Sequence, residues 1–304
     1  MSSSASAVPR PLADLSRRVA VVVVGIPTVL TLVYLGGWIF GALVAVMAAL
    51  ATWELYRLAA ARGVQPLRWL GVVGAPALVL AAVRWSRFDE YAPVALAVLA
   101  GVALVALVSA LFIRRPDESP LAVVAVTLFG VMYSGLSLAS APLLCELPSA
   151  RGWGGAEASP WMGLAVVVLP LAVTWIGDAA AYFAGSAWGR RKLAPGISPQ
   201  KTWVGLWAEL AAAALAGVAW MAATRSALPQ APIPGPGVAA LVGMLLGLGA
   251  VVGDLAESLL KREAGVKDSG TFFPGHGGVL DRIDALVFTL PLAYVLLVVV
   301  GRLS

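Results

Sequence analysis

Residues 237–261 read GVAALVGMLLGLGAVVGDLAESLLK. No charged residue stands before Asp254, so 17 consecutive residues carry uncharged, mostly apolar side chains or none. A helix needs about 20 mainly apolar residues to cross a membrane. The stretch therefore predicts a membrane-spanning helix with acidic side chains near one end.

The whole chain has the composition of a membrane protein. Of its 304 residues, 60% are hydrophobic and 12% are charged, whereas soluble domains average about 25% charged residues. A soluble core cannot bury that much apolar surface, so lipid must solvate much of it. We expect an all-α polytopic fold of about nine membrane helices. They lie roughly at 19–36, 38–60, 67–84, 92–113, 120–145, 161–188, 203–224, 237–261 and 283–301.

These spans divide the chain into three parts. Residues 1–18 are rich in Ser, Ala and Pro and predict a flexible cytoplasmic tail. Residues 19–145 hold about five helices with little charge, which we interpret as a transmembrane scaffold. Residues 161–304 hold about four helices and form the expected catalytic region, with cytoplasmic motif loops at 189–202 and 262–282. The first span has no clear cleavage site after it, which favours a retained helix over a signal peptide.

The basic residues predict the orientation of the chain. With a cytoplasmic N-terminus, 16 of the 21 Lys and Arg residues fall in cytoplasmic segments. Because cytoplasmic loops carry an excess of these residues, we expect the N-terminus inside and the C-terminus outside. The positive charges are scattered between apolar runs, which excludes a nucleic-acid-binding face. Cys145 and His276 are the single cysteine and histidine, so a disulfide framework and a His-cluster metal site are excluded.

The densest polar stretch runs from Gly253 to Asp284. Asp254, Glu257 and Lys261 share one helical face. Asp254 lies about 10 Å along the axis from Lys261, within the membrane. An ionised carboxylate there costs about 3 kcal/mol or more unless it is paired or bound to a cation. These acids are therefore candidate functional residues.

A glycine-rich loop and the start of the last span follow. The loop PGHGG at 274–278 lets backbone N–H groups converge on phosphate oxygens. Asp281 and Asp284 then open the last helix, where acids are electrostatically favoured. Asp254 and Asp281 come from consecutive helices that meet at one cytoplasmic end, so they could share a metal ion. Taken singly, first-turn helix acids and an ordinary Glu257–Lys261 pair remain alternatives.

A second polar stretch runs from Thr174 to Gly205. Asp178 lies within the sixth expected span, and Lys201 lies in the loop that follows it. Together with the cationic residues at 190–192, Lys201 would suit a polyphosphate. A packing role for Asp178 and membrane anchoring by the arginines remain alternatives.

The two stretches resemble the motifs of the phosphatidate cytidylyltransferase family over about residues 174–284. The downstream motif is carried by Ser258, Lys261, Arg262, Lys267, Asp268, Pro274, His276, Gly277, Gly278, Asp281, Arg282 and Asp284. The upstream motif is carried by Asp178, Ala181, Tyr182, Gly185, Gly189, the run KLAP at 192–195, Ser198, Pro199, Lys201 and Thr202. Two positions depart from the family pattern. Ala179 replaces a frequent hydroxyl residue, and Val204 replaces a common Glu or Gln.

The resemblance implies transfer of CMP from CTP to phosphatidic acid, which gives CDP-diacylglycerol and pyrophosphate in phospholipid biosynthesis. It implies Mg²⁺ held by Asp254 and Asp281, with room for a monovalent cation such as K⁺. Lys267 and His276 would join these acids as catalytic residues. The implied substrate- or nucleotide-binding residues are Asp178, Ser198, Lys201, Thr202, Glu257, Lys261, Arg262, Asp268, Gly277, Gly278, Arg282 and Asp284.

The chemistry of the substrates agrees with this interpretation. A phosphate monoester has a second pKa of about 6, so it needs little general-base help. Lys201, Lys267 and Arg282 would instead offset phosphate charge. The expected location is the bacterial cytoplasmic membrane, with the active site facing the cytoplasm. The expected partners are CTP, phosphatidic acid and the lipid bilayer, with no nucleic acid, and a homodimer is left open.

Three other functions remain as alternatives: a CTP-dependent lipid kinase, a related lipid cytidylyltransferase, and a cation or solute transporter. A transporter would use Asp178, Asp254 and Glu257 as an ion path, with acids at the membrane midplane. Here the acids lie toward one face, beside lysines and a glycine-rich loop, which favours phosphate chemistry.

Overall fold

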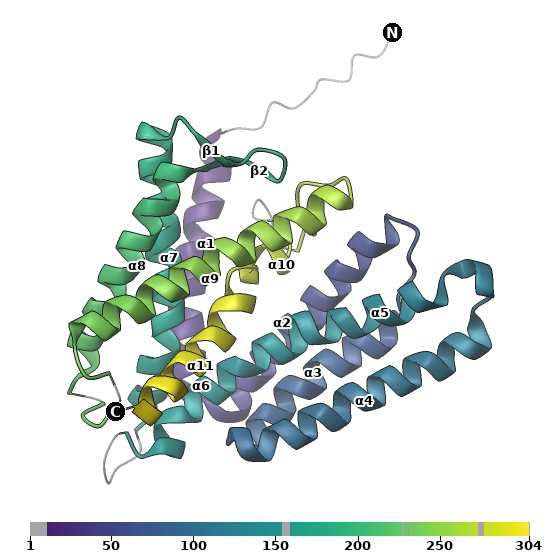
Figure 1. The fold of residues 1–304 in the computed structure, drawn as a ribbon, viewed down its shortest axis with the longest axis horizontal. Coiled ribbons are helices and arrows are strands. Elements are labelled where there is room, and N and C mark those ends of the chain that lie inside the picture. The colour runs from purple at the N-terminus through teal and green to yellow at the C-terminus, as the bar shows by residue number, and fades with distance from the viewer. Residues whose placement is uncertain (1–10, 154–158, 227, 232, 273–276, 304) are drawn as a thin grey trace.

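The fold is described by a computed structural model that covers residues 11–153, 159–226, 228–231, 233–272 and 277–303. Helices make up nearly all of this part of the chain (Figure 1), which confirms the all-α prediction. The only sheet among these residues is a two-stranded hairpin. The molecule is therefore a bundle of long helices with one small projection.

The chain forms its helices in the order expected from its apolar runs. The N-terminal helices are α1 (Pro11–Leu35), α2 (Gly37–Ala60), α3 (Arg68–Arg84), α4 (Phe88–Ile113), α5 (Pro120–Gly130) and α6 (Ser137–Arg151). A 3-10 turn at Pro116–Glu118 precedes α5, and a π-helical turn at Val131–Leu136 joins α5 to α6. The C-terminal elements are α7 (Pro160–Trp188), β1 (Lys192–Ala194), β2 (Ser198–Thr202), α8 (Trp203–Thr224), α9 (Pro236–Glu263), α10 (Leu280–Ile283) and α11 (Leu286–Leu303).

Seven helices in the described part of the chain are long and apolar enough to cross a membrane. They are Gly37–Ala60, Phe88–Ile113, Pro120–Arg151, Pro160–Trp188, Trp203–Thr224, Pro236–Glu263 and Leu280–Gly301. The multi-pass prediction is therefore confirmed, whereas the count of nine is not. The expected span at 19–36 corresponds to the shorter apolar segment Val23–Leu35, and that at 67–84 to the 17-residue helix α3.

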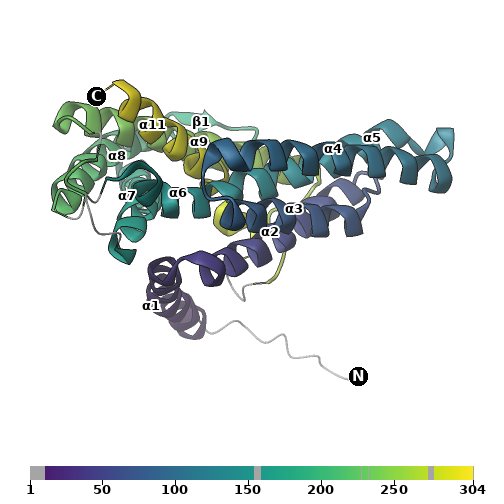
Figure 2. The same ribbon diagram turned by 90° about the horizontal axis from the view of Figure 1, so that it is seen from below.

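The helices differ in how much of their surface other helices cover. In the most apolar window of α4, 17% of the residues are buried, compared with 50% in α2. Helix α4 runs along the edge of the bundle in Figure 1, and Figure 2 shows α1 set to one side, beside α7 and α2. The exposed apolar surface of α4 is what a lipid-facing helix requires.

Glycines bring α8 and α9 into close contact. A Cβ atom on Gly243 would lie 2.1 Å from the carbonyl oxygen of Ala213, and one on Gly217 would lie 2.3 Å from that of Ala239. Such small residues let membrane helices approach backbone to backbone. This crossing fixes α9 against α8 and sets the geometry of the space between them at the hairpin end.

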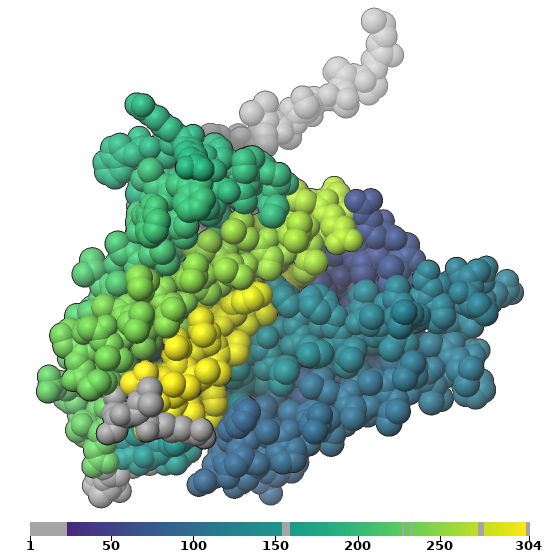
Figure 3. Space-filling view, in the orientation of Figure 1, coloured from purple at the N-terminus to yellow at the C-terminus, as the bar shows by residue number. Residues whose placement is uncertain are grey.

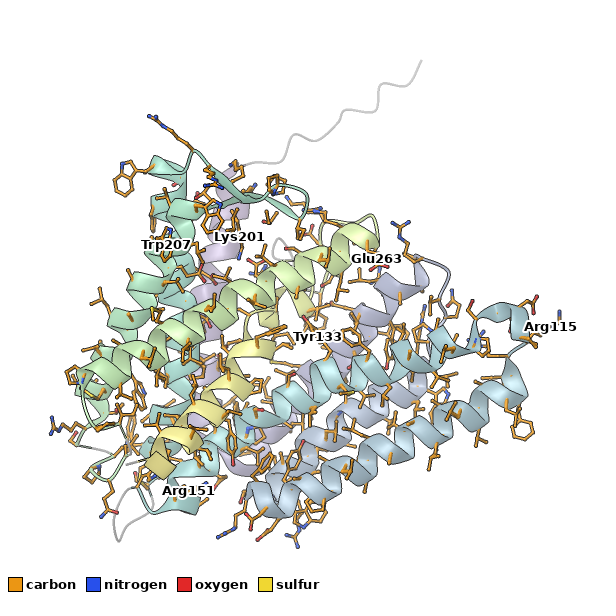
Figure 4. All side chains as sticks on the ribbon, viewed as in Figure 1. Arg115, Tyr133, Arg151, Lys201, Trp207 and Glu263 are labelled. Atoms are coloured by element: carbon orange, nitrogen blue, oxygen red, sulfur yellow. The ribbon has the colours of Figure 1, made fainter. Side chains whose placement is uncertain are left out.

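The hairpin projects beyond the helices at one end of the bundle (Figure 3). Strands β1 and β2 pair antiparallel, with Lys192 opposite Thr202 and Ala194 opposite Ser198. The hairpin links the end of α7 to the start of α8, within the motif loop expected at 189–202. Figure 4 shows Lys201 and Glu263 toward this end and Arg151 at the opposite one.

Large aromatic side chains are exposed close to the hairpin. We refer to Tyr182 and Trp188 of α7 and Trp207 of α8 as the aromatic collar. Figure 4 shows Trp207 at the level of Lys201. Exposed Trp and Tyr residues are typical of the boundary between membrane and water.

Candidate active site

A pocket of about 300 Å³ lies between α7, the hairpin, α8 and α9. We call it the hairpin pocket. Its chemically important lining residues are Asp178 of α7, Ser198, Lys201 and Thr202 of β2, Glu209 of α8 and Asp254 of α9. Five of these six are sequence-predicted site residues. The structure thus brings the upstream motif and the first acid of the downstream motif into one cavity.

An ion pair spans the hairpin pocket. Lys201 Nζ lies 2.8 Å from Asp254 Oδ2, and the two side chains are 20% and 33% exposed. The hydroxyl of Ser258, one turn further along α9, donates to Asp254 Oδ1 at 3.1 Å. The Lys201 and Asp254 side chains are therefore held in place while still accessible to a ligand.

Acidic side chains outnumber cationic ones in the hairpin pocket. Lys201 is within electrostatic range of Asp178 and of the buried Glu209, and both of these acids are within range of Asp254. Three acidic side chains therefore lie around one ammonium group. Because like charges repel strongly where water is scarce, a polyphosphate would enter this pocket favourably only together with cations.

Close packing around Thr202 shapes the hairpin. Its Oγ1 accepts a hydrogen bond from the N–H of Gly205 at 3.1 Å and so caps α8. A Cβ atom on Gly189 would lie 2.5 Å from this oxygen, and one on Gly185 would lie 3.0 Å from it. These glycines allow the end of α7, the end of β2 and the start of α8 to pack closely together, which places Lys201 over the pocket.

A second group of polar residues lies where α9 meets the start of the last span. We call Glu257, Lys261, Ser269, Gly278 and Asp281 the signature cluster. Lys261 Nζ contacts the Glu257 carboxylate and lies 2.7 Å from Asp281 Oδ1. Asp281 Oδ2 accepts from Ser269 N at 3.0 Å, Ser269 Oγ at 3.0 Å and Gly278 N at 2.7 Å. The cluster ties the downstream motif to α9.

Asp284 connects the two groups. It lies within electrostatic range of Asp254, Lys261 and Asp178. A Cβ atom on Gly253 would lie 2.6 Å from the carbonyl oxygen of Asp284, so α9 passes directly against the chain just before α11. The hairpin pocket and the signature cluster are therefore neighbouring parts of one polar region.

Other predicted site residues lie outside these groups. Lys267, Asp268 and Arg282 are exposed. Arg262 is also exposed, and its Nε donates to the carbonyl oxygen of Ile197 in the hairpin at 3.2 Å. Gly277 has φ 82°, and a Cβ atom there would lie 2.6 Å from Asp281 Oδ2. His276 lies outside the described residues.

Two acids of this region were not among the residues predicted from the sequence. Glu209 is 3% exposed and lines the hairpin pocket. Glu54 of α2 is 5% exposed and accepts hydrogen bonds from Ser269, Val279 and Leu280. Both stand inside apolar spans, and an acid in such a place is itself a signal of function. Glu54 belongs to residues 19–145, which were interpreted from the sequence as a scaffold, so its acidic side chain was not considered as a site residue.

The donors around each acid decide which of them fits a metal ion. No three His, Cys, Asp or Glu side chains converge on a metal-binding position among the described residues. The Asp281 carboxylate receives Lys261 and three further donors and is 5% exposed. Asp254 is more open. Mg²⁺ commonly binds one or two carboxylates together with substrate phosphates, so Asp254 fits this ion better than Asp281 does.

Comparison with known proteins covers nearly the whole chain. A family model described as the cytidylyltransferase family matches residues 16–300. A phosphatidate cytidylyltransferase of Synechocystis sp. is 35% identical over 295 residues, with 92% of this chain and 95% of that protein covered.

Two further relatives match different extents of the chain. A phosphatidate cytidylyltransferase of Brucella suis is 43% identical over 165 residues, or 54% of each chain. Phosphatidate cytidylyltransferase 5, chloroplastic, of Arabidopsis thaliana is 32% identical over 279 residues, with 86% of this chain and 67% of that protein covered.

Proposed function

This chain belongs to the cytidylyltransferase family, and from that premise we propose that it makes CDP-diacylglycerol from CTP and phosphatidic acid. It is a membrane nucleotidyltransferase of phospholipid biosynthesis. The observation that carries the proposal is the hairpin pocket, in which Lys201 and acids from three helices line one cavity.

Lys201 binds the triphosphate in this proposal. Its ammonium group lies at the pocket wall, and its ion-pair partner among the described residues is the partly exposed carboxylate of Asp254. A triphosphate that enters the pocket offers more negative charge than Asp254 alone, so Lys201 shifts toward it. Ser198 and Thr202, on the same strand, line the adjoining wall.

Asp254 is the proposed ligand of a divalent cation, with Mg²⁺ as the expected ion. When bound, the ion neutralises phosphate charge and helps to align an in-line displacement. Acidic side chains outnumber cationic ones in the hairpin pocket, which supports the need for a divalent cation when the triphosphate binds. Asp178, Glu257 and Asp284 add to the negative surroundings, where a monovalent cation such as K⁺ would also be accommodated. Sharing of the divalent ion between Asp254 and Asp281 stays a prediction.

The reaction needs no general base from the chain. An oxygen of the lipid phosphate forms a bond to the α-phosphorus of CTP, while the bond from that phosphorus to the bridging oxygen breaks. Pyrophosphate leaves with the electron pair, and CMP is joined to the lipid phosphate. Because the nucleophile is already largely anionic near neutral pH, the chain has to bring two anions together and hold them in line. Lys201 serves this purpose in the hairpin pocket, and Lys267, Arg282 and His276 remain predicted contributors.

The proposed location is the bacterial cytoplasmic membrane, with the hairpin end facing the cytoplasm. The excess of Lys and Arg in segments at that end supports this orientation. The N-terminus would then be cytoplasmic and the C-terminus outside. The homodimer left open by the sequence would be tested by light scattering of the protein in detergent.

Two labelled forms of CTP test the reaction. Purified protein in detergent would receive Mg²⁺, phosphatidic acid and CTP labelled either at the α-phosphate or at the γ-phosphate. We expect the α-label in the lipid fraction and the γ-label in pyrophosphate. A parallel reaction would replace phosphatidic acid by diacylglycerol, which lacks the attacking phosphate.

Each contrary outcome identifies another function. Transfer of the γ-label to diacylglycerol would establish a CTP-dependent lipid kinase. Transfer of the α-label to a different phospholipid, but not to phosphatidic acid, would establish a related lipid cytidylyltransferase. Cation flux into proteoliposomes without CTP, with no labelled lipid, would establish a transporter.

A further inference from the structure

Glu54 joins the N-terminal helices to the signature cluster. It belongs to α2, yet the three hydrogen-bond donors that it meets in the described part of the chain lie more than 200 residues further along. Glu54 Oε2 accepts from Ser269 Oγ at 2.9 Å and from Leu280 N at 2.8 Å, and Oε1 accepts from Val279 N at 3.1 Å. The carboxylate therefore binds the N–H groups at the start of α10, as a capping residue does, but from another part of the fold.

The surrounding backbone is built to admit this side chain. A Cβ atom on Gly270 would lie 2.3 Å from Glu54 Oε1, and one on Gly278 would lie 2.3 Å from Oε2. Real Cβ atoms do not approach so closely, so a side chain at either position would displace the Glu54 carboxylate from these donors. Glu54 is also 5% exposed, and a buried carboxylate is costly unless it is hydrogen-bonded. The hydrogen bonds from the downstream motif therefore offset the cost of burying this carboxylate.

The contact continues to Asp281. Ser269 Oγ lies 2.9 Å from Glu54 Oε2 and 3.0 Å from Asp281 Oδ2. A hydroxyl has one hydrogen, so the two carboxylates share a single O–H donor. Asp281 in turn lies 2.7 Å from Lys261 Nζ. A continuous chain of contacts thus runs from α2 through Ser269 and Asp281 to α9.

We infer that Glu54 is a positioning residue for cytidylyl transfer, which acts through Ser269 and Asp281 on the polar end of α9. This inference rests on the proposed function. Glu54 does not reach the hairpin pocket; it fixes the segment that carries the downstream motif against the helix that carries Asp254. Part of the active-site geometry is therefore determined by the N-terminal half of the chain.

Glu54→Gln and Ser269→Ala test the inference, alone and combined. Glutamine keeps the shape of Glu54 but replaces one acceptor oxygen by a donor. Whichever oxygen is replaced, the N–H of Val279 or of Leu280 loses its acceptor. We expect kcat to fall about 10- to 100-fold, as for other small misplacements of reacting groups. KM for both substrates should stay within about threefold, because substrate contacts are intact. The double variant should be no worse than Glu54→Gln, because both changes break the same chain of contacts.

Thr52→Val is the matched control. Thr52 lies two residues before Glu54 on α2, is fully buried and donates to the carbonyl oxygen of Ala48 at 2.7 Å. The hydrogen bonds described for Thr52 go to the carbonyl oxygens of Ala48 and Gly130, neither of which belongs to the signature cluster. This variant should lower the melting temperature in detergent while kcat stays unchanged. An equal loss of kcat in Thr52→Val and Glu54→Gln would overturn the inference, because the effect would then follow stability alone.

Other outcomes also decide the question. Wild-type kcat in Glu54→Gln, or additive effects of the two changes, would overturn the inference. If Glu54→Gln does not fold, Ser269→Ala decides alone, and unchanged kcat there would overturn it. Wild-type protein that makes no CDP-diacylglycerol would overturn the proposed function as well, whereas an active wild type with an equally active Glu54→Gln variant would overturn this inference alone.

Discussion

Lys201 of β2 and Asp254 of α9 form an ion pair, with 2.8 Å between Nζ and Oδ2, across the hairpin pocket. The lysine belongs to a projecting hairpin, and the acid belongs to a helix packed tightly against α8. A ligand that replaces either partner of this pair therefore opens a contact between the hairpin and the bundle.

Replacement of Lys201 tests the role of its charge. Lys201→Met should lower kcat/KM for CTP about 100- to 1,000-fold, the usual effect of removing one group that stabilises developing charge. The measurement is incorporation of α-labelled CTP into lipid. Arg225→Met, at the exposed position that follows α8, is the control and should retain activity. Equal losses in both variants would point to the overall charge of the protein rather than to Lys201.

Replacement of Asp254 tests the metal prediction. Asp254→Asn should reduce kcat about 100-fold or more and raise the Mg²⁺ concentration needed for half-maximal activity. Activity would be titrated with Mg²⁺ at fixed CTP, and Asp117→Asn, in the exposed turn before α5, serves as control. An unchanged Mg²⁺ requirement in an active Asp254→Asn protein would remove this acid from the metal site.

Asp281 should respond differently from Asp254. Its side chain is 5% exposed and bound to Lys261 and three other donors. Breaking one partner of a buried ion pair costs about 3–5 kcal/mol, so Asp281→Asn should unfold at a clearly lower temperature. The pair of Asp254 is partly exposed, and its loss should cost about 1 kcal/mol or less. Thermal unfolding in detergent compares the two. Full activity in Asp281→Asn would exclude this residue from the metal site.

The crossing of α8 and α9 can be tested with two glycines of α9. A Cβ atom on Gly243 would lie 2.1 Å from the carbonyl oxygen of Ala213, whereas nothing lies within 4 Å of that position at Gly237. Gly243→Ala should therefore destabilise the protein by about 1–3 kcal/mol, the usual cost of overpacking. Gly237→Ala should be neutral. Equal melting temperatures for the two variants would contradict the close crossing.

Thiol labelling tests the orientation. Cysteine would be introduced as Lys192→Cys or as Arg225→Cys in a Cys145→Ala background. These positions follow α7 and α8 respectively and are exposed. A reagent that does not cross membranes, added outside spheroplasts, should label the protein carrying Arg225→Cys and spare the one carrying Lys192→Cys. The reverse pattern would place the hairpin outside the cytoplasm.

Local sequence was sufficient to predict most of the helices. A run such as 237–253 is expected to be helical in a membrane, because a helix satisfies the backbone hydrogen bonds within the segment itself. Helix α3 was harder to count because its 17 residues are close to the length limit. The hairpin was expected only as a loop, since strands as short as Lys192–Ala194 have no periodicity to detect.

The site was predictable only in part. Asp178, Lys201 and Asp254 come from motifs with a chemical reason to meet, and the hairpin pocket contains all three. The contact between Glu54 and Leu280 has no local signal, because the two residues are separated by 226 positions. Pairings of this kind depend on how distant helices pack, which composition and spacing do not specify.

The aromatic collar has a consequence for the enzyme's kinetics. Tyr182, Trp188 and Trp207 are of the residue types enriched where a bilayer meets water, and Lys201 lies at the level of Trp207 (Figure 4). A lipid phosphate would therefore reach the hairpin pocket by sideways diffusion within its own leaflet, while the nucleotide arrives from solution. The concentration of phosphatidic acid that matters is then the one in the membrane surface, whereas that of CTP is the one in the solution volume. The rate should follow the mole fraction of phosphatidic acid in the surface, so diluting it with inert lipid should slow the enzyme even when its amount per volume is constant.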